Sequence, residues 1–319
     1  MTLVSTRKPQ SSVSRTWRKE VVAFVVAACA LASLVCLPVW LDPKGLESAN
    51  SWWVLPAMMY TPAVATMLVI RWMHPRSPRE VVRSLGLAPI RPAAQLIAFS
   101  VGGIFLLLGT VAAGIGVSTV LGFDRLDLNG FSGYAALLPD TALQAAPIGV
   151  LVAVQVALLP AAAVFNGLLA FGEEIGWRGW LLPALQPLGN WPAVLLTGVA
   201  WGIWHTPLIL LGYNFDRPDA GGVLLMVAGC VAVGSLLGWL RIWSGSIWPC
   251  VFGHGAFNAA GGLIFLLSSA DANPDLALAG PLGVGTWVVV LLLVAAGLVA
   301  SRVRTTRSRV PVAAESRRT

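Results

Sequence analysis

Long uninterrupted apolar segments dominate this 319-residue chain. A helix needs about 20 apolar residues to cross a bilayer, and the segment 21–41 is the first of several that reach that length. Membrane-barrel strands instead alternate in polarity over about ten residues, a pattern that these segments lack. Only 11% of the residues are charged, whereas soluble domains carry roughly a quarter. The chain is therefore predicted to be an all-α, polytopic membrane helical bundle.

The apolar segments predict about eight transmembrane helices, separated by segments that contain charged residues, proline or glycine. The expected spans are 21–41, 52–73, 93–122, 147–172, 192–212, 221–240, 246–268 and 281–300. The four cysteines all lie within these segments and none has CxxC spacing. We expect them to be small core residues rather than a redox or metal motif.

The distribution of Lys and Arg predicts the orientation of the bundle. If both termini are cytoplasmic, 18 Lys and Arg residues fall in cytoplasmic segments, and only Lys44, Arg125 and Arg217 are external. Basic residues concentrate on the cytoplasmic side of membrane proteins. The net charge of +7 is thus explained by orientation and does not require a nucleic-acid partner. We expect an integral protein of the cell membrane with both termini in the cytoplasm.

Two adjacent glutamates stand near the cytoplasmic end of the fourth expected span, in the sequence Glu173-Glu174-Ile-Gly-Trp-Arg178. Adjacent residues on a helix point about 100° apart, so the two carboxylates cannot share one face. Glu174 and Arg178 are spaced to form an ion pair, which leaves Glu173 free to take a proton. Asn166 lies on the same helical face as Glu173 and is expected to support it. The alternative, a solvated helix end with a surface salt bridge, is disfavoured by the apolar flanking sequence.

Two histidine motifs lie in the fifth and seventh expected spans. In the first, Trp201 is one helical turn before His205 and can pack on it, and Pro207 should bend the helix just beyond the histidine. In the second, His254 and Asn258 project from one face as two hydrogen-bond donors. Either histidine alone could be an ordinary buried residue. Three polar motifs in one expected half of the membrane indicate a shared functional site.

The order Glu-Glu-x-x-x-Arg, aromatic-x-x-x-His, His-x-x-x-Asn resembles the CPBP family of CAAX proteases and bacteriocin-processing (Abi) proteins, which includes the Rce1-like proteases. The resemblance covers about residues 145–268. It places the functional positions of the family on Glu173, Glu174, Arg178, His205, His254 and Asn258. Trp201 stands where the family usually has Phe, and Asn258 where it often has Asp.

The resemblance implies an intramembrane endopeptidase, a type of protease often described as metal-dependent, and the residues leave two mechanisms open. In the first, Glu173 and His205 activate a water molecule while His254 and Asn258 stabilise the oxyanion. In the second, Glu173, His205 and His254 bind zinc, which activates the water. The histidines lack HExxH spacing and Asn258 cannot be an anionic ligand, so the first mechanism is favoured. We expect the site to face the cytoplasm.

With this resemblance the chain is expected to divide into five parts. These are a cytoplasmic segment (1–20), N-terminal transmembrane helices (21–144), a catalytic core (145–268), a last helix with its external loop (269–300) and a basic cytoplasmic tail (301–319). The expected partners are membrane lipids and a peptide or protein substrate, either lipidated or not. Two other functions remain open: a non-catalytic scaffold or self-immunity protein, and a transporter that uses the buried polar residues.

Overall fold

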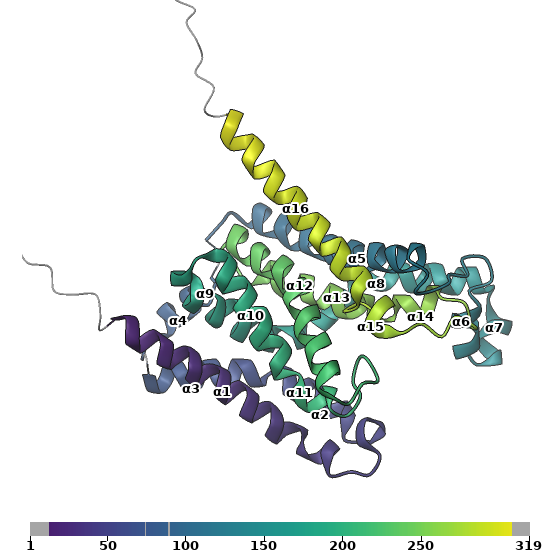
Figure 1. Cartoon of the computed structure of the whole chain (residues 1–319), viewed down its shortest axis with the longest axis horizontal. Coiled ribbons are helices and arrows are strands. Elements are labelled where there is room, and N and C mark those ends of the chain that lie inside the picture. The colour runs from purple at the N-terminus through teal and green to yellow at the C-terminus, as the bar shows by residue number, and fades with distance from the viewer. Residues whose placement is uncertain (1–12, 74, 89, 308–319) are drawn as a thin grey trace, which may run out of the picture.

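A computed structural model describes residues 13–73, 75–88 and 90–307 of the chain. Over these residues the fold is helical (Figure 1), which confirms the all-α prediction; the only strand-like pairing there is an isolated bridge between Leu126 and Ser268. The long helices are α1 (Val13–Trp40), α3 (Thr61–Met73), α5 (Ala93–Val120), α8 (Ile148–Glu174), α10 (Asn190–Trp204), α12 (Ala220–Ser244), α13 (Trp248–Ala259) and α16 (Val284–Arg307). The shorter ones are α2 (Ser51–Met59), α4 (Pro78–Ser84), α6 (Ser132–Leu137), α7 (Asp140–Ala145), α9 (Leu182–Leu185), α11 (Thr206–Ile209), α14 (Leu263–Leu267) and α15 (Leu276–Ala279).

Seven helical stretches in the described part of the chain are long and apolar enough to cross a membrane. The fifth expected span, 192–212, is not among these seven because α10 stops at Trp204 and His205 caps it. Pro207 has no N–H to donate to the carbonyl of Ile203, and the hydroxyl of Thr206 donates to that carbonyl instead, at 2.6 Å. The predicted bend beyond His205 is therefore confirmed, as a break between α10 and α11.

The fourth apolar stretch runs further than expected, from Ile148 to Leu188. Pro160 lies inside α8 without ending it. After Glu174 the helix widens into a π-helical turn over Ile175–Leu181, in which all seven residues are buried. Such turns are rare and frequently occur at functional sites. Glu173 and Glu174 thus lie inside a long helical segment and not at its cytoplasmic end.

The loops that join the helices gather on two opposite faces of the bundle. We call the first the acidic face; it comprises segments 41–50, 121–147, 205–219 and 268–283. These segments contact one another through the pairs Trp40–Pro207, Arg125–Asp271, Arg217–Asp275 and Asp127–Leu267. These segments, with their nine acidic residues, are the ones that the charge distribution predicts to be external.

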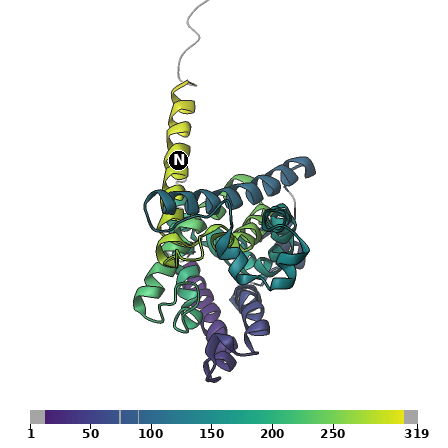
Figure 2. The same ribbon diagram turned by 90° about the vertical axis from the view of Figure 1, so that its right-hand side faces the viewer.

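We call the opposite end the basic face; it comprises 75–92, 182–190 and 241–248. Hydrogen bonds join two of these segments. Arg91 donates to the carbonyls of Trp243 and Ser244. In return, the Ser246 hydroxyl donates to the carbonyl of Gly86 and the Trp248 indole to that of Leu87. Figure 1 shows α4 and α9 at one end of the molecule and α6 and α7 at the other. Both views show α16 extending away from the other helices (Figure 2).

Helix α13 is central and packs on α8 and α5. It approaches α8 closely because Gly255 has no side chain: a Cβ there would lie 2.2 Å from the carbonyl oxygen of Ala163 and 2.4 Å from the nitrogen of Gly167. Small residues allow membrane helices to approach in this way. The close approach at Gly255 brings His254 against the end of α8.

Candidate active site

Four of the six expected functional side chains line one cavity of about 430 Å³. Glu173 comes from α8, His205 from the end of α10, and His254 and Asn258 from α13. The other polar side chains that line it are Asn166, Tyr213 and Asn214, besides the indoles of Trp201 and Trp204. The rest of the wall is apolar. A mainly apolar cavity with a few convergent polar groups is the usual form of a ligand site.

Trp201 connects three of these side chains and is only 2% exposed. Its indole N–H donates to Oε2 of Glu173 at 2.6 Å. Its carbonyl oxygen lies 2.9 Å from Nδ1 of His205, and its ring centroid lies 5.1 Å from that of His254, in edge-on geometry. We expected Trp201 to cover His205, but Trp204 is closer to that imidazole, at 4.6 Å against 5.9 Å. Trp201 instead orients the glutamate and both histidines.

The partner of His205 determines its tautomer. A carbonyl oxygen can only accept, so Nδ1 must carry the proton in the contact with Trp201. The neutral ring then has an unprotonated Nε2. Because His205 lines the cavity, this nitrogen is available to a water molecule or a substrate.

Glu174 and Arg178 lie behind the cavity wall and are fully buried. Nη1 of Arg178 donates to Oε1 of Glu174 at 2.8 Å, so the predicted ion pair is present. The same carboxylate oxygen also lies 2.8 Å from Nδ1 of His254, a contact that the sequence did not predict. The guanidinium lies 4.5 Å from the centroid of the Trp201 ring. Glu174 therefore orients His254 as well as pairing with Arg178.

Asn166 lines the cavity, but its amide donates to the carbonyl of Ala162 at 3.0 Å rather than to Glu173. Sequence reasoning also missed the loop residues Tyr213 and Asn214, which line the cavity from the acidic face. They follow the helix break at Pro207, and nothing in the local sequence indicated that this loop folds back over the site.

The described residues do not fit a zinc site. No three His, Cys, Asp or Glu side chains in 13–73, 75–88 and 90–307 converge closely enough to hold a metal ion. Glu173, His205 and His254 share the cavity, yet they are not arranged as the ligand set that the zinc alternative requires.

The cavity lies towards the acidic face. Its wall includes 213–215, Leu276 and 280–282, in addition to Leu55, Pro56 and Met59 near the start of the second span. None of the described residues of the basic face lines it. The cavity therefore lies nearer to the loops that the sequence predicts to be external than to those that it predicts to be cytoplasmic.

Comparisons with known proteins agree with the motif geometry. A family model described as "Type II CAAX prenyl endopeptidase Rce1-like" matches residues 148–260, a range that contains all six expected functional residues. The curated "CAAX prenyl protease 2" of Methanococcus maripaludis is 38% identical over 50 residues, which are 15% of this chain and 18% of that relative. The aligned part thus spans less than a fifth of that relative. Through residues 148–260, this membrane-embedded chain carries a domain of the Rce1-like type II CAAX prenyl endopeptidase (CPBP/Abi) family.

Proposed function

We propose that this protein is an intramembrane endopeptidase that hydrolyses a peptide bond in the cavity beside Trp201. One observation carries the proposal: Glu173, His205, His254 and Asn258, from three separate helices, line the same buried cavity. A carboxylate, two imidazoles and an amide are the groups that activate water and stabilise an oxyanion. The match to a protease family over residues 148–260 supports the same reading.

In the proposed reaction, Glu173 and Nε2 of His205 hold a water molecule. Glu173 removes a proton from it as the water oxygen attacks the carbonyl carbon of the substrate. The negative charge on the carbonyl oxygen is then stabilised by the Asn258 amide and by Nε2–H of His254. As the C–N bond breaks, Glu173 delivers the proton to the leaving amine.

Glu174 has a positioning role in this mechanism. For Nε2 of His254 to donate to the oxyanion while Nδ1 donates to Glu174, the imidazole must carry both protons. The carboxylate of Glu174 lies 2.8 Å from Nδ1 and is the acceptor for that second proton. Arg178 pairs with the same oxygen and holds Glu174 in place.

The proposed substrate is a peptide with an apolar or lipid-bearing segment. Leu55, Met59, Leu169 and Phe257 contribute apolar surface to the cavity, which suits such a segment. The matched relative is named as a protease of prenylated proteins, so a lipidated substrate fits the same surface. We further propose that the protein lies in the cell membrane with both termini cytoplasmic, on the basis of its Lys and Arg distribution.

The test is cleavage of a fluorescence-quenched peptide library by purified protein in lipid vesicles. The variants are Glu173→Gln, His205→Ala, His254→Ala and, as a matched carboxylate control away from the cavity, Glu47→Gln. We expect Glu173→Gln to retain less than about a hundredth of the wild-type kcat, since a positioned general base contributes roughly 10²–10⁴-fold. Glu47→Gln should remain as active as wild type, and a chelator should leave activity unchanged.

Three results would contradict the proposal or its mechanism. Substantial activity in Glu173→Gln would remove this residue from the role of general base. Absence of cleavage by a folded wild-type protein across the library would favour the non-catalytic scaffold instead. Activity that a chelator abolishes and that zinc restores would favour the zinc mechanism instead.

A further inference from the structure

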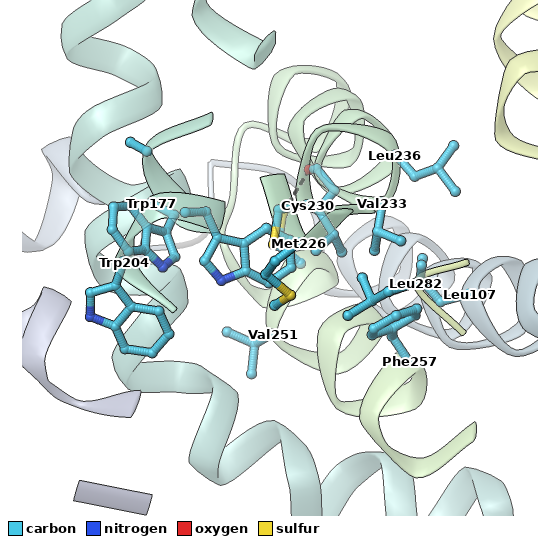
Figure 3. Close-up of a cluster of buried hydrophobic side chains, with 14 of the residues drawn as sticks. Leu107, Trp177, Trp204, Met226, Cys230, Val233, Leu236, Val251, Phe257 and Leu282 are labelled. Carbon is cyan, nitrogen blue, oxygen red and sulfur yellow. Dashed lines mark hydrogen bonds between the residues drawn. The ribbon is translucent and has the colours of Figure 1, made fainter. Parts of the chain in front are cut away.

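A layer of aromatic side chains lies between the cavity and the basic face. Directly after Glu173 and Glu174, the turn Ile175–Leu181 is wholly buried. Its Trp177 packs edge-on against Phe24 of α1, with centroids 5.6 Å apart, and against Trp204 of α10, at 5.9 Å. Figure 3 shows Trp177 and Trp204 side by side. Trp204 lines the cavity and Trp177 does not, so Trp177 lies behind this part of the cavity wall.

Two contacts join the turn Ile175–Leu181 to the basic face. Nε of Arg241 donates to the carbonyl of Arg178 at 3.1 Å. The carbonyl of Leu85, which lies just after α4, would be 3.3 Å from a Cβ placed on Gly179. The loops of the basic face therefore rest directly on the turn Ile175–Leu181, which lies between them and the cavity, although none of its residues lines the cavity.

The opposite wall belongs to the acidic face and is partly exposed. Tyr213, Asn214, Leu276 and Pro281 line the cavity from two loops and are neither fully buried nor fully exposed. An ion pair between Arg217 and Asp275, at 2.6 Å, joins these loops beside the cavity. The accessible side of the site is thus the acidic face.

The charge distribution indicates which side of the membrane that face meets. Arg178 is buried in the core and does not report on orientation, so 17 of the 18 basic residues counted as cytoplasmic remain. The acidic face holds only Lys44, Arg125 and Arg217. A ratio of 17 to 3 strongly favours a cytoplasmic basic face and an external acidic face.

We infer that the cavity opens to the outside of the membrane, so that the substrate is an extracytoplasmic peptide segment, such as the juxtamembrane part of a secreted or membrane-anchored protein. The substrate part of this inference rests on the proposed function, whereas the direction of the opening does not. It replaces the cytoplasm-facing site expected from sequence. A prenylated tail that stays in the cytoplasm would not reach the cavity.

The test uses single-cysteine variants of the full chain in a bacterial host, with a membrane-impermeant maleimide as the probe. Leu276→Cys reports on the cavity wall, Lys44→Cys and Ala220→Cys on the acidic face, and Arg83→Cys, as the matched control, on the basic face. The chain without substitution gives the background, because its cysteines are buried or partly buried. In intact cells whose outer membrane has been permeabilised, we expect labelling of the first three variants and none of Arg83→Cys.

Activity is measured separately, with the quenched peptide library added outside right-side-out or inverted membrane vesicles. We expect cleavage in right-side-out vesicles, loss of it in inverted ones, and inhibition by the maleimide only in Leu276→Cys. Labelling of Leu276→Cys only in inverted vesicles, or cleavage only there, would overturn the inference and leave the protease proposal standing. External labelling without cleavage in either preparation would support the direction of the opening and contradict the proposed function.

Discussion

Trp201 is the residue on which the geometry of the site most depends. Its indole, its carbonyl and its ring face contact Glu173, His205 and His254, respectively. It lies on α10, so one helix aligns groups from two others. Tryptophan is therefore required here for its N–H as well as for its size.

Trp201→Phe tests the hydrogen bond to Glu173. Phenylalanine keeps an aromatic ring and the backbone carbonyl but removes the N–H donor. A hydrogen bond to a charged group contributes about 1.5–3 kcal/mol, so we expect kcat to fall about 10- to 100-fold with a smaller change in KM. A comparison of kcat and KM in proteoliposomes checks this. Unchanged kcat would mean that the bond does not position Glu173 during the reaction.

Glu174→Asp tests the orientation of His254. The shorter side chain keeps the charge that Arg178 needs but withdraws the carboxylate from Nδ1 of His254. We expect kcat to fall by about tenfold, within the range of lost oxyanion stabilisation, while the melting temperature changes little. The pH profile of kcat should also shift, which a merely structural role would not produce. A profile identical to wild type would contradict the positioning role.

At the scale of elements, helix breaks and close helix contacts assemble the site. Pro207 ends α10 directly after His205, so this histidine lies at a helix end and the chain can turn back over the cavity. Gly255 lets α13 approach α8 closely enough for His254 to reach Glu174. Each feature depends on a single residue, yet it brings together side chains that are far apart in the sequence.

Gly255→Leu tests the contact between α13 and α8. A side chain at this position would overlap backbone atoms of Ala163 and Gly167, which cannot yield as a side-chain end can. Overpacking usually costs about 1–3 kcal/mol, so we expect a clearly lower melting temperature and loss of activity. Gly109→Leu on α5 is the matched control, because no atom lies within 4 Å of its Cβ position. Equal stability of the two variants would contradict the packing.

At the scale of the whole molecule, stability depends on buried groups more than on surface charges. The Arg178–Glu174 pair is fully buried, whereas in the Arg217–Asp275 pair the side chains are 47% and 39% exposed. Exposed pairs contribute little because water and salt screen them. Removal of one partner from a buried pair leaves an uncompensated charge in the core.

Arg178→Gln and Arg217→Gln form a matched comparison of these two pairs. We expect Arg178→Gln to lower the free energy of unfolding by about 3–5 kcal/mol, and Arg217→Gln by less than about 1 kcal/mol. Thermal or denaturant unfolding in detergent measures both. Similar losses in the two variants would show that burial does not distinguish the pairs.

The sequence by itself determined the helical membrane class, seven of the eight expected spans and the identity of the polar residues, because apolar length and the cost of buried charge are local properties of the chain. It also determined the break after His205, because a proline removes a backbone hydrogen bond within its own helix. Only the tertiary structure decided that Glu174 contacts His254, that Trp201 aligns three groups and that the 213–215 loop lines the cavity. These contacts join residues from separate helices, whose relative rotation and depth depend on packing such as that of Gly255. For the same reason the side on which the cavity opens could be argued only once the loops of each face were known.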